Sequence, residues 1–143
     1  MNDDLTCGWP GGATRFLALR MLPGEDLRGR LETVFAAQPE TAGFVAACVG
    51  SLTSARLRPA GRDDALEVAG PLEIVALSGT LSVDGPHLHV AVSDAEGRMT
   101  AGHLLAGSVV RTTVEVVLGL TDAVTFTRRD DPRTGYAELF FDG

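Results

Sequence analysis

Only one stretch of this chain has the spacing of a helix, and that limits the possible folds more than any other feature. Between residues 25 and 37, apolar side chains recur at helical intervals, at Leu27, Leu31, Val34 and Phe35. A Pro-Gly turn precedes this stretch, and Pro39 ends it. The other apolar segments are short or alternate in the manner of strands. One helix among many strands predicts an α+β fold, with a mostly antiparallel sheet that the helix covers on one side.

Turn signals rather than long linkers separate the strand segments, so a single domain is expected. Residues 1–13 are rich in Gly and predict a flexible leader, and residues 14–143 form the domain. Residues 42–51 are apolar enough for a buried strand, whereas the alternation of residues 52–58 favours an edge strand. The strands are predicted at residues 14–22, 42–51, 52–58, 72–83, 86–93, 98–106, 109–118, 121–128 and 136–141.

Composition is that of an ordinary globular protein with acidic character. Of 143 residues, 45% are hydrophobic, and no apolar run approaches the ~20 residues of a membrane span. The N-terminus lacks the basic start and apolar block of a signal peptide, so a cytoplasmic protein without membrane contact is expected. Cys7 and Cys48 do not form a disulfide framework. The net charge of -7 repels phosphate backbones and argues against DNA binding by the isolated domain.

Some strands are apolar on both faces, as the segment with Val114, Val116, Val117 and Leu118 illustrates. A domain of this size has few elements with which to cover both faces of a sheet. The sequence therefore predicts a homo-oligomer in which other copies cover the remaining face.

The three histidines of the chain, His87, His89 and His103, lie within seventeen residues of one another. His87 and His89 are two positions apart, so on a strand their side chains point the same way. The sequence from Asp94 to Arg98 suits a three-residue hairpin loop, because Gly97 stands where a left-handed residue is needed. That loop places His103 directly opposite His89. A loop of two or four residues would put His103 on the other face.

Three imidazoles on one face suit a divalent metal ion, with zinc as the first choice. The same three ligands with an open position also occur in catalytic zinc sites, which need a base and a substrate pocket. Glu73 and Glu115 are the candidate carboxylates, although each also suits an ion pair with Arg or a solvent-facing position. The alternative is that the histidines only pack or form hydrogen bonds at a surface or a subunit contact.

Two arginine-rich segments have simpler interpretations than nucleic-acid binding. Arg28-Gly29-Arg30 falls within the helix pattern and predicts a solvated helix face. Arg128-Arg129 is followed by Asp130-Asp131, so these charges are expected to neutralise one another near a hairpin tip.

The order and spacing of several segments form a recognisable pattern between about Thr14 and Phe141. These segments are residues 16–20, 23–27, 49–52, 55–57, 72–80, 86–90, 102–104 and 131–139. Together they resemble the plant and prokaryote conserved (PPC) domain family. The resemblance implies an α+β fold with a central antiparallel sheet and a homotrimer.

The resemblance also allows a comparison with the parts of family members that contact DNA and protein partners. Bacterial members of the family carry a provisional DNA-binding label, whereas in plant members an attached AT-hook contacts the DNA. This sequence has no hook. It also departs from the plant pattern at residues 70–74, where plant members carry an Arg and a Phe before the Glu of a segment that contacts partners.

The residues predict a metal site formed by His87, His89 and His103, and the resemblance adds the expectation of a homotrimeric binding module with a regulatory or DNA-binding role. A metal-dependent enzyme that uses the same histidines and a structural trimer without metal are the alternatives.

Overall fold

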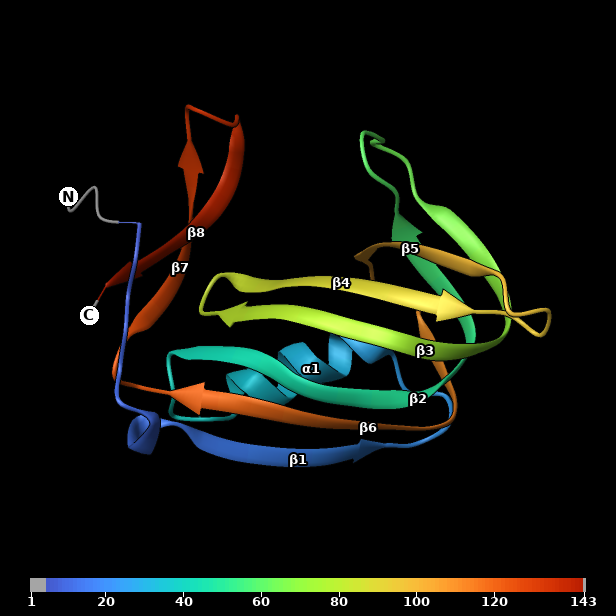
Figure 1. The fold of residues 1–143 in the computed structure, drawn as a ribbon, viewed down its shortest axis with the longest axis horizontal. Helices are drawn as coiled ribbons and strands as arrows, with labels where there is room; N and C mark the ends of the chain where they lie inside the picture. Colours follow the sequence, from blue (N-terminus) through green and yellow to red (C-terminus); the bar gives the residue numbers. More distant parts are fainter. Residues whose placement is uncertain (1–4, 143) are drawn as a thin grey trace.

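The computed structural model describes residues 5–142, in which a curved sheet encloses one α-helix and a separate hairpin stands beside it (Figure 1). The elements are the 3-10 turn Gly11–Ala13, β1 Arg15–Met21, α1 Leu27–Ala36, β2 Ala42–Arg58, β3 Leu66–Ser82, β4 Gly85–Ser93, β5 Met99–Leu104, β6 Val109–Thr121, β7 Thr125–Asp131 and β8 Tyr136–Asp142. The predicted α+β fold is confirmed, and each predicted strand region overlaps a strand, although residues 122–124 of the predicted strand 121–128 form a bend between β6 and β7.

The main sheet has the order β1-β6-β2-β3-β4-β5, and every neighbouring pair is antiparallel. The end of β2 also pairs with β5, through Leu57 opposite Leu104 and Arg58 opposite His103. This extra pairing joins β2, β3, β4 and β5 into a closed ring of strands. It brings the end of β2 next to the end of β5, although some 45 residues separate them in the sequence.

The prediction that residues 52–58 form an edge strand is wrong. Residues 42–58 are one strand, β2, which has β3 on one side and first β6, then β5, on the other. The alternation that suggested an edge arises because Ala55 and Leu57 are fully buried while Arg56 is exposed. Such a pattern shows that one face of the strand meets solvent, and it says nothing about whether the backbone is paired on both sides.

The helix lies on the inner side of the sheet, where its apolar side chains join the core (Figure 1). Leu27, Leu31 and Phe35 are its buried residues, at the spacing that the sequence predicts. Asp26 caps its N-terminus, since its carboxylate accepts hydrogen bonds from the backbone N–H groups of Gly29 (2.7 Å) and Gly107 (2.6 Å).

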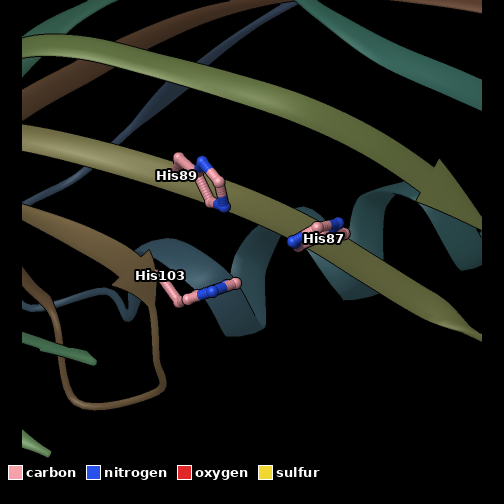
Figure 2. A group of neighbouring side chains, drawn as sticks. All are labelled: His87, His89 and His103. Carbon is pink, nitrogen blue, oxygen red and sulfur yellow. The ribbon is translucent and has the colours of Figure 1, made fainter. Parts of the chain in front are cut away.

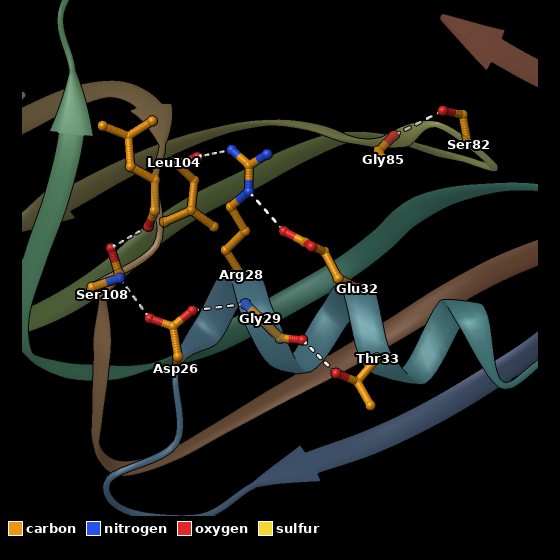
Figure 3. Close-up of polar contacts among 11 residues, drawn as sticks. Asp26, Arg28, Gly29, Glu32, Thr33, Ser82, Gly85, Leu104 and Ser108 are labelled. Carbon is orange, nitrogen blue, oxygen red and sulfur yellow. Dashed lines mark hydrogen bonds and ion pairs between the residues drawn. The ribbon is translucent and has the colours of Figure 1, made fainter.

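Polar contacts of the first helical turn then fix α1 against β5 (Figure 3). The Arg28 guanidinium donates to the backbone oxygen of Leu104 at 3.0 Å and pairs with Glu32. Arg30 pairs with Glu25. The Arg28-Gly29-Arg30 segment lies in the helix as predicted; Arg30 faces solvent, whereas Arg28 is half-buried and bonded to β5.

The hairpin of β7 and β8 forms its own two-stranded sheet, which stands next to the turn between β3 and β4 (Figure 1). A small second core of Ala42, Val124 and Phe126 attaches it to the body. Trp9 packs against Phe126 with ring centroids 6.1 Å apart, so this part of residues 1–13 contacts the hairpin. Residues 1–4 of the predicted leader lie outside the described residues.

One region on the outer face of the sheet, the face turned away from α1, is rich in exposed apolar side chains. We call it the apolar surface; it is formed by Phe16 and Ala18 of β1, Val117 of β6, and Ala47 and Val49 of β2. Phe16 is 61% exposed and Val49 is 57% exposed. Among the described residues there is no helix that is both long enough and apolar enough to cross a membrane.

Candidate metal centre

The three histidines lie on the outer face of the β4–β5 hairpin, and the loop of this hairpin sets their register. The backbone N–H of Asp94 donates to Arg98 O at 2.9 Å, and that of Gly97 donates to Asp94 O at 3.0 Å. Gly97 has φ +76°, the left-handed conformation that the three-residue loop requires. His89 is consequently opposite His103, as predicted.

The imidazoles converge on one point in front of the sheet (Figure 2). One ring nitrogen from each histidine lies within 4.8 Å of the others. The ring centroids of His87 and His103 are 5.2 Å apart, with His89 at 5.1 Å from the first and 4.6 Å from the second. Tetrahedral zinc with Zn–N bonds of ~2.0–2.1 Å needs nitrogens roughly 3.4 Å apart. Small rotations of these side chains would bring the three nitrogens to that spacing.

The neighbouring strand β3 approaches this site closely. Gly79 lies opposite Leu88, and a Cβ built on Gly79 would be only 2.0 Å from the backbone oxygen of His87. Gly79 also has φ +141°, a conformation that other residues rarely adopt. Glycine at this position therefore allows β3 to pair with the segment of β4 that carries His87 and His89.

Electrostatics favours the neutral imidazole, which is the form that binds metals. Burial lowers the pKa of His87, and the charge of Arg128 and the neighbouring imidazoles lower it further, while Glu138 raises it. Burial likewise lowers the pKa of His103, together with the charge of Arg58 and His89. Two guanidinium groups thus act on the cluster from different strands.

Two adjoining cavities open beside the cluster. One, of about 250 Å³, is lined by His87 and His89 together with Thr80, Arg128 and Glu138. The other, of about 360 Å³, is lined by His89 and His103 together with Arg58 and four alanines, Ala60, Ala76, Ala91 and Ala101. Ser78 and His89 belong to both cavities, so the histidine cluster lies where the two meet.

The two carboxylates that the sequence indicated lie elsewhere. Glu73 is exposed and lies opposite Ser51 and Ser93, and Glu115 lies opposite Arg20 and Val49 near the apolar surface. Neither lines a cavity beside the histidines. The carboxylate that does so is Glu138, which is distant in sequence from all three histidines.

The expected mutual neutralisation of residues 128–131 is wrong. Asp131 pairs with Arg133, and Arg129 pairs with Asp142. Within residues 5–142, the guanidinium of Arg128 forms no ion pair within 4.0 Å; it donates to Thr80 Oγ1 at 3.4 Å, while the backbone N–H of Arg128 donates to the Asp84 carboxylate at 2.9 Å. The partners of Arg129 and Asp131 come from outside the segment: Asp142 lies on the paired strand β8, and Arg133 lies in the turn.

The cysteines carry no part of this site. Both are free, as expected. Cys48 packs against the main core, and burial raises the pKa of its thiol to about 11. Its thiol is therefore unreactive at neutral pH.

The sequence model of the Plants and Prokaryotes Conserved (PCC) domain matches residues 10–122. A protein named "Bifunctional protein GlmU" from a Synechococcus strain is 48% identical over 130 residues, which are 91% of this chain and 21% of that protein. The chain thus spans about a fifth of the length of the curated relatives it matches.

Solved structures share the fold over nearly all of the chain. A hypothetical protein from Salmonella enterica has a TM-score of 0.88 at 42% identity and covers 90% of this chain and 94% of its own. A protein from Archaeoglobus fulgidus described as metal-containing has a TM-score of 0.76 at 25% identity, and the match covers 88% of this chain and 93% of that protein. A protein from Bacteroides thetaiotaomicron provisionally described as DNA-binding has a TM-score of 0.75 at 19% identity, over 93% and 95%, and this likeness shows the fold alone.

Proposed function

The chain belongs to the Plants and Prokaryotes Conserved (PCC) domain family, and from this premise we propose that it is a homotrimeric module that binds a divalent metal ion through His87, His89 and His103. Zinc is the metal that three neutral imidazoles with an open position suit best. The module has a regulatory role, which it performs through a protein partner or DNA.

The convergence of the three imidazoles carries this proposal. All three histidines of the chain are present in one cluster, with ring nitrogens within 4.8 Å. The lowered pKa values of His87 and His103 keep these side chains in the ligand form near neutral pH. The description of the Archaeoglobus relative as metal-containing supports the same function.

The apolar surface supports self-association. Phe16 and Val49 are more than half exposed in the single chain. Exposed apolar side chains that gather on one face mark a contact with another protein, and closed symmetric assemblies of identical chains are the commonest kind. The family resemblance points to three copies.

A regulatory role through DNA has weaker support than metal binding. Proteins of this fold include one provisionally described as DNA-binding, and the net charge of -7 opposes contact with phosphate backbones. Direct binding predicts a gel shift with duplex DNA that weakens strongly as salt increases. Absence of a shift at low salt would leave a protein partner as the target.

Elemental analysis of the purified protein tests the metal site. We expect about one zinc or similar ion per chain in the wild type. The His103→Ala variant should bind zinc at least a hundredfold more weakly, because the binding free energy of a structural zinc site, roughly 10–16 kcal/mol, is divided among about four ligands. Met99→Ala is the matched control, because Met99 is exposed on the same face of β5. Wild-type protein that takes up no metal even after incubation with Zn²⁺ would leave a structural trimer as the remaining explanation.

A metal-dependent enzyme is the second candidate, and the cavity lined by Glu138 is the observation that favours it. His87, His89 and His103 would hold the ion, which would supply a water acidified to a pKa of ~7, and Glu138 would be the general base of the site. Hydrolysis of p-nitrophenyl acetate by the zinc-loaded protein, lost in Glu138→Gln at unchanged metal content, would support this function. Equal rates for the protein and free Zn²⁺ would exclude hydrolysis of such esters.

A further inference from the structure

Two arginines from distant strands flank the histidine cluster on opposite sides. Arg58 ends β2 and lies opposite His103, and it lines the cavity that contains His89 and His103. Arg128 of β7 lines the other cavity, with His87 and His89. The chain therefore places one guanidinium on each side of the proposed metal site.

The guanidinium of neither arginine forms an ion pair with a carboxylate within 4.0 Å among the described residues. Within residues 5–142, seven arginines lie within 4.0 Å of an Asp or Glu: Arg15, Arg28, Arg30, Arg56, Arg62, Arg129 and Arg133. Arg58 and Arg128 are not among them, although both side chains are half-buried. Burial lowers the pKa of Arg128, and the charge of Glu138 raises it only in part. A desolvated guanidinium without an anion is unfavourable.

The charge of the site is therefore unbalanced. Three neutral imidazoles leave the two charges of a divalent ion uncompensated, and the guanidinium groups add two more. Glu138 is the one carboxylate among the residues that line the two cavities. Such a site attracts an anion, and an arginine next to a metal ion suits a carboxylate or phosphate with two oxygens to share.

The shape of the site favours a small molecule with an apolar part. The cavities measure about 250 and 360 Å³, at the low end for small-molecule sites. The larger one is lined by four alanines next to Arg58. Methyl groups at that position suit a short aliphatic chain better than a second charged group.

We propose that the histidine cluster binds a small aliphatic carboxylate, with its oxygens between the metal ion and the guanidinium groups of Arg58 and Arg128 and its aliphatic part in the alanine-lined cavity. This rests on the proposed metal site. It identifies the class of ligand that fills the open coordination position, and Arg58 and Arg128 are the residues that select an anion.

Cobalt substitution provides a direct test, because the visible spectrum of Co²⁺ reports on its ligands. Protein loaded with Co²⁺ is titrated with butyrate, inorganic phosphate and neutral butyramide, and cobalt content is measured in the same samples. We expect a saturable spectral change with butyrate, a weaker one with phosphate and none with butyramide. Arg58→Gln and Arg128→Gln should each weaken butyrate binding about tenfold to a hundredfold, as expected for loss of a hydrogen bond between charged groups.

Arg129→Gln is the matched control. Arg129 is adjacent to Arg128 on β7, but its guanidinium pairs with Asp142 and lies over the Phe140 ring, so butyrate affinity should not change. Full cobalt loading without any response to butyrate would overturn the ligand and leave the metal site intact. Phosphate binding that equals or exceeds butyrate binding would overturn the aliphatic carboxylate. A chain that takes up no Co²⁺ would overturn both proposals.

Discussion

The outer face of one sheet carries two regions with opposite character. The apolar surface covers β1, β6 and β2, and the histidine cluster lies on β4 and β5, with Arg58 beside it at the end of β2 and Arg128 reaching it from β7. In both regions strand alternation sends every second side chain outward, so the backbone does not distinguish them. The two regions differ in the kind of partner that they bind favourably. An extended apolar surface contributes binding free energy in proportion to the area removed from water, whereas a small charged cluster contributes it through a few directed contacts.

This contrast explains how one small domain can both assemble and bind a ligand. The curvature caused by the β2–β5 pairing turns the histidine strands away from the plane of β1 and β6. The two regions share β2, which contributes Val49 to one and Arg58 to the other. If they act independently, a substitution in one should leave the other unchanged.

Val49→Asp should have the largest effect, because it places a charge on one of the most exposed side chains of the apolar surface. We expect the mass in solution to fall from three times 15.0 kDa to that of one chain, with metal content per chain unchanged. Light scattering coupled to size-exclusion chromatography measures the mass. Val83→Asp is the control, since Val83 is similarly exposed (55% against 57%) but lies outside the apolar surface. Loss of metal together with assembly would show that the two regions are coupled.

Gly79→Ala should damage the histidine region alone. The added Cβ would overlap the backbone oxygen of His87, so β3 and β4 must separate, at a cost of at least about 3 kcal/mol in the free energy of unfolding, and zinc binding should be lost. Gly85→Ala is the control: Gly85 also has positive φ but has no atom within 4 Å of the added Cβ, so only about 1 kcal/mol is expected. Urea unfolding measures both variants. Equal losses would mean that strain, rather than the close approach, accounts for the effect.

The histidine hairpin could be predicted because all the information it needs is local. The loop from Asp94 to Arg98 contains its own left-handed glycine, and this fixes which residues of β4 and β5 face each other. The helix was predictable for the same reason, since Leu27, Leu31 and Phe35 mark its buried side at helical intervals.

The arginines and the carboxylate beside the histidines could not be predicted in this way. Arg58 lies next to His103 because β2 pairs with β5. Arg128 and Glu138 belong to the β7–β8 hairpin, which tertiary contacts hold beside the histidines. No local pattern encodes such pairings, because they depend on how the whole sheet curves. The error over residues 52–58 has the same origin, since alternation reports exposure of a face and pairing is decided by distant strands.

Metal should stabilise the chain by an amount that depends on metal concentration rather than protein concentration. At free Zn²⁺ a hundredfold above its dissociation constant, the free energy of unfolding should rise by about 2.7 kcal/mol. His103→Ala should show no such rise, whereas Val49→Asp should retain it. Thermal unfolding with and without Zn²⁺, at several protein concentrations, separates the two effects. A zinc effect that vanishes in Val49→Asp would place the metal at a contact between copies.

Acid should affect the β7–β8 hairpin, which holds Arg128 over the cluster, more than the apolar surface. The Asp131 carboxylate accepts hydrogen bonds from the backbone and guanidinium of Arg133, which lowers its pKa from 3.8 to about 2. As the pH falls, Asp131 therefore becomes protonated at a higher pH in the unfolded chain than in the folded chain. The stability that Asp131 provides is complete above about pH 4 and is lost as the pH falls toward 2.

Asp131→Asn should be less stable than the wild type at pH 7 and should lose less stability on acidification. The fluorescence of Trp9, the one tryptophan of the chain, reports on the hairpin because Trp9 packs against Phe126. Asp130→Asn is the control, since Asp130 has no ion pair within the described residues. If the Trp9 signal of both variants follows the wild type down to pH 2, the turn does not hold the hairpin in place. Arg128 would then depend on the contacts of Phe126 and Asp84 for its position above the histidines.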